Sequence, residues 1–347
     1  MDVADFDFEL PDALIAQHPP AERGGSRLLT LPLDGTAMHH GAFVDLPLWL
    51  RAGDLLVIND TRVFPARLLG RRDPSGGQVE CLLLERSGDD RWLALVHPGQ
   101  KLKPGARVVF EGSGVALHGE ILDRHFHGRR TVRLWRSGGG SVDDAVDVIG
   151  HIPLPPYIRR QDDPQDRDRY QTVYANARGS IAAPTAGLHF TPAILARLKE
   201  QGVETAAVTL HVGYGTFKPV RTERVEDHAV DAERFDVSPA AAAVLTRALQ
   251  ERRRVIAVGT TTARVLESLQ VQGGVVQPAA GATDLFIRPG HQFRLVQGLV
   301  TNFHLPRSSL LMLVCALGGQ ERVLAAYREA VARQYHFYSY GDAMLVL

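Results

Sequence analysis

Three histidines flanked by apolar residues are the side chains of this sequence best suited to acid–base chemistry. His189, His211 and His304 lie in the contexts LHF, LHV and FHL, close to glycines and small polar residues. An isolated histidine of this kind is usually a hydrogen-bonded core residue, but three in such surroundings favour at least one general acid or base. A zinc site made of the three is the alternative. None has a companion ligand at i+4 or in a Cys-x-x-Cys motif, so we expect no metal.

Small polar residues and glycines gather at five places where an apolar run ends. The clearest is VIAVGTTTARVLES, in which a strand turns through Gly259 into a helix whose first turn holds Thr260 and Thr261. Backbone N–H groups and hydroxyls there suit a carboxylate, a ribose or a phosphate, although helix capping explains the threonines equally well. Because open α/β sheets bind ligands at the carboxyl ends of their strands, we expect one shared pocket. The other stretches are NDTRVFPARLLG (59–70), APTAGLHFT (183–191), LHVGYGTFKPV (210–220) and TNFHLPRSSLLM (301–312).

Several common cofactor and catalytic motifs are absent from the sequence. No G-x-G-x-x-G follows an expected strand, and there is neither a Walker A motif nor a Gly-x-Ser-x-Gly nucleophile turn. Gly213 and Gly215 therefore indicate only a sharp turn or a close approach of the backbone. Arg264 and Glu267 lie one turn farther along the helix after Gly259 and are consistent with a structural ion pair.

The elements that must position these motifs form an α/β domain interrupted by a β-rich segment. Continuous apolar runs at 54–58 and 255–259 predict buried strands, and Thr191-Pro192 predicts the start of a helix. From residue 78 to about 136 the sequence changes to short β-type runs separated by Gly, Pro and Asp. We predict an α/β main domain with an inserted small all-β barrel, the first made of residues 1–66 and 151–347 and the second of residues 67–150.

Composition is that of an ordinary soluble protein without a global charge. Among 347 residues, 39 Lys and Arg balance 39 Asp and Glu, so no long-range field attracts nucleic acid or a membrane. Cys81 and Cys315 lie in apolar runs, as buried thiols do in a reducing compartment. The acidic N-terminus is unlike a signal peptide, and the longest apolar run, 310–317, is far shorter than a membrane helix. We expect a cytoplasmic monomer without membrane contact.

Nine motifs, in order and nearly end to end, resemble those of the S-adenosylmethionine:tRNA ribosyltransferase-isomerase family of queuosine biosynthesis. The resemblance implies transfer of the ribosyl group of S-adenosylmethionine to 7-aminomethyl-7-deazaguanine at the wobble position of a tRNA. Isomerisation on the way gives epoxyqueuosine and releases adenine and methionine. The resemblance also implies that no cofactor is needed, since S-adenosylmethionine is a substrate. It further implies an α/β domain interrupted by a small β-barrel. The motifs are NDTRVFPARL, HIPLPPYIRR, YQTVYA, APTAGLHFT, LHVGYGTFKPV, VGTTTARVLES, TDLFIRPG, TNFHLPRSSLLMLV and YSYGDAML.

The sequence departs from the family pattern at a few positions. Where the family commonly reads H-x-M-H-x-E, residues 228–233 read HAVDAE, which keeps His228 and Glu233 but places Asp231 at a histidine position. Tyr214 stands where a small residue is usual. The first departure weakens the case for a catalytic residue at position 231.

Motif position and side-chain chemistry assign expected roles within this reaction. The sulfonium charge acidifies the neighbouring ribose carbon, so a neutral base there would remove a proton and open the sugar ring. We expect His189 or His211 to be that base, with Asp60 to orient or charge it. Thr260 and Thr261 are expected to bind the methionyl carboxylate or the ribose, Thr301, Asn302, His304 and Ser308 the nucleoside or target base, and Arg62, Arg67 and Arg307 the tRNA phosphates. Further expected substrate contacts are Thr185, Gly187, Gly213, Gly215 and Arg264.

Two other functions are consistent with composition alone. A methyltransferase would use the same donor and release S-adenosylhomocysteine, although the glycine-rich loop typical of dinucleotide-type sites is missing. A non-catalytic RNA-binding protein would bind tRNA without consuming S-adenosylmethionine. The density of polar motifs at strand ends counts against the second.

Overall fold

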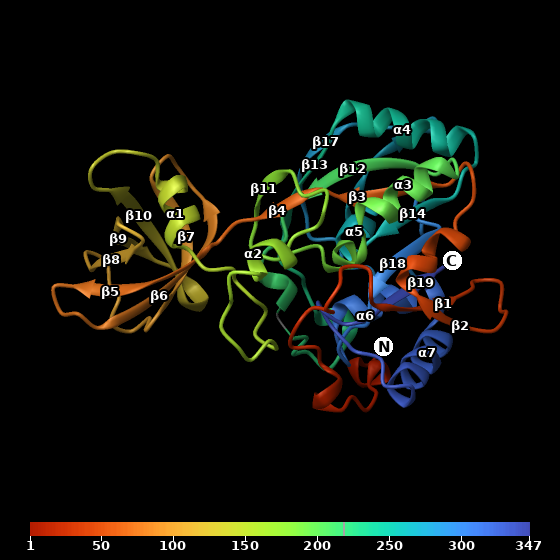
Figure 1. The fold of residues 1–347 in the computed structure, drawn as a ribbon, viewed down its shortest axis with the longest axis horizontal. Coiled ribbons are helices and arrows are strands. Elements are labelled where there is room, and N and C mark those ends of the chain that lie inside the picture. Colours follow the sequence, from red (N-terminus) through yellow and green to blue (C-terminus); the bar gives the residue numbers. More distant parts are fainter. Residues whose placement is uncertain (218) are drawn as a thin grey trace.

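The structure is a computed structural model that describes residues 1–217 and 219–347. It consists of an α/β domain and, at one end of the molecule, a closed β-barrel, as Figure 1 shows. The predicted fold class is confirmed. Both chain termini lie in the α/β domain.

A nine-stranded mixed sheet forms the centre of the α/β domain. Its four central strands, β12 (Glu204–Leu210), β3 (Leu55–Asn59), β14 (Val255–Val258) and β18 (Gly298–Asn302), are parallel, so their carboxyl ends meet at one edge. Every residue of β3 and β14 is buried, as expected for strands covered on both faces. In sheet order the strands are β17 (Ala279–Thr283), β13 (Glu233–Val237), β12 (Glu204–Leu210), β3 (Leu55–Asn59), β14 (Val255–Val258), β18 (Gly298–Asn302), β19 (Ala343–Val346), β1 (Arg27–Leu31) and β2 (His39–Ala42).

Helices cover both faces of this sheet and begin where the sequence signals predict. Thr191 caps the helix of Pro192–Glu200 by accepting from Ile194 N, and Ser238 caps the helix of Pro239–Gln250 in the same way. Apolar helix faces pack on the sheet in two clusters, one on each side. The helices are α2 (Asp166–Arg169), α3 (Pro192–Glu200), α4 (Pro239–Gln250), α5 (Thr260–Ser268), α6 (Ser309–Gly318) and α7 (Gln320–Ala332), and the 3-10 turns are η1 (Val3–Phe6), η2 (Asp12–Leu14), η3 (Phe43–Leu48), η5 (Thr185–His189), η6 (Tyr214–Phe217) and η7 (Val225–Asp227).

The barrel has six antiparallel strands and its own apolar core. Alternate residues of β6 are buried, as a half-buried strand requires. The sequence did not predict helix α1 (Val142–Ile149), which Ser141 and Asp144 start with a reciprocal capping box and whose Ala145 and Val146 pack into the barrel core. The strands are β5 (Arg67–Asp73), β6 (Gln78–Arg86), β7 (Arg91–His97), β8 (Arg107–Gly112), β9 (Val115–Arg124) and β10 (Arg129–Arg136), with the turn η4 (Phe126–Gly128) before the last.

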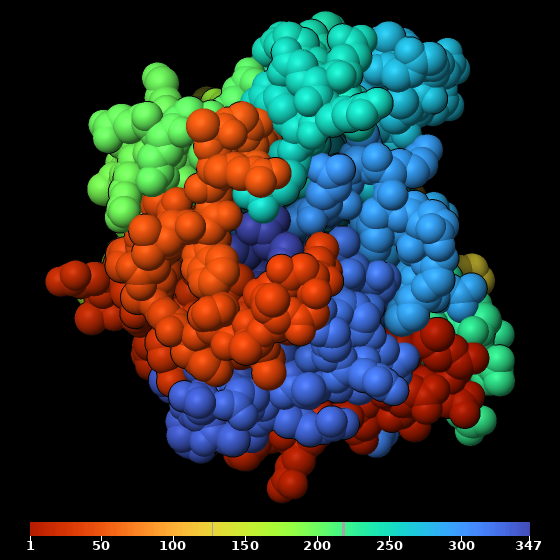
Figure 2. Space-filling model, turned by 90° about the vertical axis from the view of Figure 1, so that its right-hand side faces the viewer, coloured from red at the N-terminus to blue at the C-terminus, as the bar shows by residue number. Residues whose placement is uncertain are grey.

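The barrel joins the α/β domain through two adjacent segments. The entering chain follows β4 (Thr61–Val63), which pairs with β11 (Ala177–Ser180), and Arg67 forms a bridge with His151 on the returning chain. At the opposite end of the molecule, the N-terminal segment lies against the C-terminal elements, because β1 pairs with β19 (Figure 2). A separate small hairpin joins β15 (Val271–Gln272) and β16 (Val275–Val276).

Both cysteines are free and buried, as the sequence predicts. Within the described ranges, no single helix has the length and apolar composition needed to cross a membrane. Helices α6 and α7 together reach that length and apolar composition, but the chain bends by 116° between them.

Candidate active site

A small cavity of about 50 Å³ lies at the carboxyl edge of the parallel strands. Strands β14 and β18 end there, and η5 closes one side with the start of APTAGLHFT. The structure thus brings together residues from four of the five predicted stretches. Six of the expected substrate residues line it, namely Thr185, Thr260, Thr261, Thr301, Asn302 and His304.

The start of α5 presents an uncapped helix N-terminus to this cavity. Gly259 has φ 89°, which a residue with a side chain rarely adopts, and it turns the chain from β14 into the helix. No described side chain caps this end. Thr262 donates to Val258 O at 2.7 Å, whereas Thr261 Oγ1 lies 3.4 Å from Asn59 Nδ2. The N–H groups of the first turn therefore remain suited to a ligand carboxylate or phosphate.

Asn302 supplies an unused acceptor to the same cavity. Its Nδ2 donates to Tyr338 O and to His189 Nε2, both at 3.0 Å. Its Oδ1 is buried without a hydrogen-bond partner among the described residues. Buried acceptors are normally satisfied, so this oxygen marks a place for a donor on a ligand.

His304 and Thr301 form a buried neutral pair beside Asn302. His304 Nε2 lies 2.8 Å from Thr301 Oγ1, and Tyr327 OH accepts from the His304 backbone N–H at 3.1 Å. Burial lowers the pKa of His304 to about 3, so the ring is neutral near pH 7.

His189 is buried behind the cavity wall and does not line the cavity. Its Nδ1 lies 2.7 Å from Ser26 Oγ, its Nε2 accepts from Asn302, and its ring packs 5.0 Å from the ring of Phe43. Burial lowers its pKa to about 4. Since both ring nitrogens are occupied, this geometry suits a residue that orients Asn302 better than one that touches substrate.

His211 is half-buried and lies between the strand-end residues and the barrel. Its Nδ1 is 2.9 Å from Thr61 Oγ1, which is 2.7 Å from Ser180 Oγ. A Cβ at Gly179 would lie 2.6 Å from the ring, so only glycine lets the imidazole rest on β11. Burial chiefly, and then Arg234, lowers the pKa of His211.

Asp60 acts on His211 only through its charge. The charge of Asp60 raises the pKa of His211 and so opposes the lowering by burial and by Arg234. Its Oδ1 does not bond to the ring but accepts a hydrogen bond from Thr209 Oγ1 at 2.6 Å. The orienting partner of His211 is therefore Thr61, which the sequence analysis did not single out.

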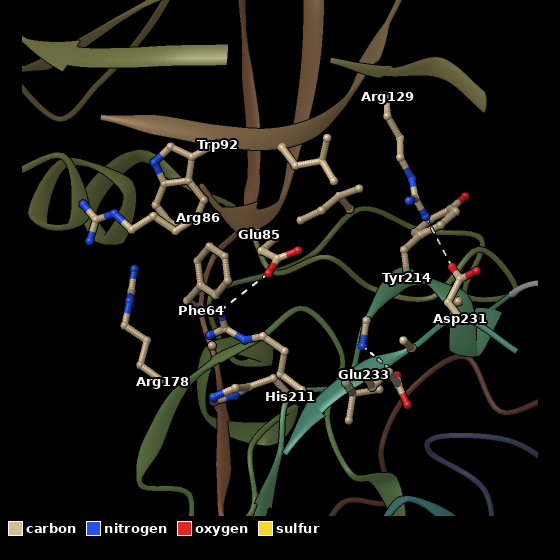
Figure 3. Close-up of a pocket in the computed structure, with 18 of the residues that line it drawn as sticks. Phe64, Glu85, Arg86, Trp92, Arg129, Arg178, His211, Tyr214, Asp231 and Glu233 are labelled. Carbon is tan, nitrogen blue, oxygen red and sulfur yellow. Dashed lines mark hydrogen bonds and ion pairs between the residues drawn. The ribbon is translucent and has the colours of Figure 1, made fainter. Parts of the chain in front are cut away.

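A second, larger cavity of about 490 Å³ lies between the barrel and the α/β domain, and His211 lines it (Figure 3). Aromatic and cationic side chains dominate the labelled walls, and Arg178 lies 4.9 Å from the centroid of Phe64. Two ion pairs cross from one domain to the other, Arg129–Asp231 at 3.3 Å and Arg234–Glu85 at 3.5 Å. Val212 lines both cavities, so they share a wall.

Glu233 shapes the glycine loop beside this cleft. Its carboxylate accepts from Gly213 N at 2.8 Å and from Thr216 Oγ1 at 3.1 Å, and it forms a buried ion pair with Arg264. The alternative pairing of Arg264 with Glu267 is wrong, because the Glu267 carboxylate accepts backbone N–H groups of the 294–296 segment. Gly215 is required, since a Cβ there would lie 2.8 Å from Asp231 Cβ.

The remaining expected substrate residues lie outside both cavities. Arg67 is ion-paired with Glu80 at 2.8 Å, and Arg307 with Asp7, so neither charge is uncompensated. Arg62 is exposed on β4. Ser308 caps α6 through Leu311 N, and Gly187 makes room for the Tyr174 hydroxyl, from which a Cβ would be 2.2 Å away.

Several residues of the cleft were not predicted. Arg178, Arg234 and Trp92 come from three separate elements that meet only in the folded chain, so no local pattern connects them. Glu233 had a signal, since it belongs to the HAVDAE segment that keeps part of the family pattern. Within residues 1–217 and 219–347, no group of three or more His, Cys, Asp or Glu side chains is placed to hold a metal ion.

Comparison with known proteins identifies the family of the chain. The model of the queuosine biosynthesis protein family matches residues 3–346. Proteins named S-adenosylmethionine:tRNA ribosyltransferase-isomerase from Anaeromyxobacter sp. and Pelotomaculum thermopropionicum are 55% and 50% identical, over 100% of this chain and 99% and 100% of their own. A crystal structure of an S-adenosylmethionine tRNA ribosyltransferase from Thermotoga maritima is 36% identical, with 99% and 100% coverage and a TM-score of 0.56. The chain therefore belongs to the queuosine biosynthesis family of S-adenosylmethionine:tRNA ribosyltransferase-isomerases, which are transferases and isomerases.

Proposed function

We propose that this enzyme transfers and isomerises the ribosyl group of S-adenosylmethionine onto 7-aminomethyl-7-deazaguanine at the wobble position of tRNA. The products are epoxyqueuosine-tRNA, adenine and methionine. The observation that carries the proposal is the position of His211 in the cleft, next to a small polar cavity with which the cleft shares Val212. Its lowered pKa makes it neutral at pH 7, as a base must be.

The two cavities divide the substrates by size. About 50 Å³ suits the small amino-acid end of the methionyl chain, whereas about 490 Å³ falls in the range of small-molecule sites. The methionyl carboxylate fits the N-terminus of α5 at Thr260 and Thr261, and the methionyl ammonium supplies the donor that Asn302 Oδ1 lacks. The nucleoside and the target base then occupy the cleft, where Phe64 and Trp92 offer aromatic surface.

His211 is the base in this proposal. With Nδ1–H donating to Thr61 Oγ1, the Nε2 lone pair takes a proton from the ribose carbon bonded to sulfur. Adenine leaves with a proton, and the aminomethyl nitrogen bonds to the former anomeric carbon and loses a proton as the bond from that carbon to the ring oxygen breaks. The deprotonated carbon next to sulfur then bonds to the former anomeric carbon, which closes the five-carbon ring, and the freed oxygen attacks the carbon that carries sulfur. Closure of the epoxide breaks the carbon–sulfur bond, and methionine leaves with a neutral sulfur. No oxidant, metal or further cofactor enters this balance.

Mass spectrometry of a complete reaction tests the proposal. The purified protein is incubated with S-adenosylmethionine and tRNA bearing 7-aminomethyl-7-deazaguanine, and the base and the small products are measured. We expect a cyclopentane-diol epoxide adduct together with free adenine and methionine. S-adenosylhomocysteine would instead identify a methyltransferase, and tRNA binding without any consumption of S-adenosylmethionine would identify an RNA-binding protein.

A further inference from the structure

We propose that the outer rim of the barrel binds the tRNA substrate. The surface is a hollow, here called the rim hollow, whose side chains are Gln100, Arg124, His125, Phe126 and Arg130. It lies between the loop after β7 and the turn between β9 and β10, outside the cleft described above. The partner follows from the proposed function, and the location follows from the charge and exposure of these residues.

Among the residues that the structure describes, no carboxylate is paired with the arginines of the rim hollow. The buried Arg130 guanidinium donates only to carbonyl oxygens, those of Gly99 at 2.8 Å, Leu102 at 3.1 Å and Arg129 at 2.9 Å. Arg124 is exposed and forms no ion pair within the described residues. Several other barrel arginines do, among them those of the pairs Arg67–Glu80, Arg71–Glu111, Arg86–Asp143 and Arg133–Glu120.

The neighbouring charges reinforce this excess. Lys101 and Lys103 are exposed on the same loop as Gln100. Asp123 is the adjacent acidic residue, but successive residues of β9 point to opposite sides of the strand, so it lies away from Arg124. Lowering of the Arg130 pKa, mainly by burial and also by Arg124, is consistent with two close cations. A phosphate would relieve their repulsion.

An exposed aromatic ring completes the rim hollow. Phe126 is 88% exposed, more than any other large apolar side chain that the structure describes. At this exposure the ring contributes little to the packing of the barrel. A solvent-exposed ring beside cationic side chains is the arrangement that stacks unpaired bases and binds phosphates in single-stranded RNA.

The rim hollow lies next to the cleft along the chain, at the start of β10. Arg129 lines the cleft, whereas its chain neighbours Gly128 and Arg130 line the rim hollow. An anticodon loop with its wobble base in the cleft would thus pass directly over η4. This proximity favours RNA over an acidic protein segment, because only the RNA carries the base that the cleft is proposed to bind.

Binding of tRNA by charge-matched variants tests the proposal. The full chain is titrated with a fluorescent tRNA transcript carrying guanine at the wobble position, at several salt concentrations. We expect Arg124→Glu to weaken binding about tenfold and to reduce the salt slope by about one, and Phe126→Ala to weaken it about fivefold. Matched controls are Arg197→Glu on α3 and Leu48→Ala, which change an exposed arginine and an exposed apolar residue far from the barrel. These should bind within twofold of the unaltered protein.

Two results would overturn the assignment. One is unchanged tRNA affinity and salt slope in both rim variants, with thermal unfolding temperatures confirming that they are folded. The other is equally effective competition by polyglutamate at the same charge concentration, which would make the surface a general anion site.

Turnover separates this inference from the proposed function. Because Arg124 and Phe126 lie outside the cleft, their substitution should raise the KM for tRNA without changing kcat or the KM for S-adenosylmethionine. If the unaltered protein consumed no S-adenosylmethionine but the rim variants still lost tRNA affinity, the proposed function would fail and the rim assignment would stand. Normal turnover with an unchanged KM for tRNA in both variants would support the proposed function and contradict the rim assignment.

Discussion

At the residue scale, the three histidines show how similar sequence contexts acquire different chemistry. His189 and His304 are buried and hydrogen-bonded, whereas His211 is half-buried beside an open cleft. His189 differs because its Nδ1 is hydrogen-bonded to Ser26, which lies 163 residues away in the chain. The sequence could therefore predict two candidate bases but could not choose between them.

Replacing His211 should abolish most of the activity. Without a base at the cleft wall, His211→Gln should lower the single-turnover rate about 10²- to 10⁴-fold, while binding of S-adenosylmethionine changes little. His40→Gln is the control, because His40 is also partly buried but bonds to Tyr335 in another part of the domain. A near-normal rate for His211→Gln would show that another group removes the proton.

The pH dependence of kcat should carry the signature of the same residue. Since the folded protein lowers the pKa of His211 below its ordinary 6.5, the base stays neutral and active down to a pH below 6.5. Activity should be lost only as the pH falls through that lowered value. A measured acid limb at or above pH 6.5 would contradict this assignment, provided that the protein remains folded by circular dichroism.

The buried histidines should make stability depend on pH. The pKa values of His189 and His304 are about 4 and about 3 in the folded state against 6.5 in the unfolded chain, so below pH 6.5 the unfolded chain binds more protons. Stability should be complete above pH 6.5 and fall by about 2 kcal/mol per histidine between pH 6.5 and 5. Urea unfolding checks this, because His189→Gln should show a shallower decrease with acid than the unaltered protein. An identical decrease would contradict it.

At the element scale, local signals located most of the strands and helices but not the contacts between them. Thr-Pro and Ser-Pro pairs marked the starts of α3 and α4, and Gly259 marked the turn into α5. Helix α1 was missed because its capping residues follow a run of glycines that reads as a flexible stretch. Thr61 was missed because its partner His211 is brought to it by the pairing of β12 with β3.

The contact between β11 and His211 predicts a glycine requirement that local sequence does not show. In Gly179→Ala the new Cβ would meet the ring at 2.6 Å, so the imidazole must move away from Thr61. We expect kcat to fall at least tenfold with a loss of stability of only about 1–3 kcal/mol. Gly281→Ala on β17 is the control, since its Cβ would meet only Phe235 at 4.0 Å. Full activity of the Gly179 variant would show that the ring position is not important.

At the scale of the whole molecule, the cleft could not be predicted from either domain alone. Its walls come from β6, β7 and β10 of the barrel and from the segments around 178, 211–215 and 231–234 of the α/β domain. Zero net charge gave no indication of a polyanionic substrate. The structure accounts for this, because arginines of the cleft are matched there by carboxylates across the domain boundary.

Removing those carboxylates should strengthen tRNA binding. Glu85→Gln with Asp231→Asn raises the net charge by two and releases Arg234 and Arg129 from ion pairs that are 3.5 and 3.3 Å long. Because both pairs are partly exposed, unfolding free energy should change by less than about 1 kcal/mol, while tRNA affinity at low salt should increase about fivefold with a steeper salt dependence. The control is Glu200→Gln with Glu251→Gln, which adds the same charge at exposed positions of α3 and the end of α4. An equal increase in the control would mean that total charge, rather than the arginines of the cleft, attracts the tRNA.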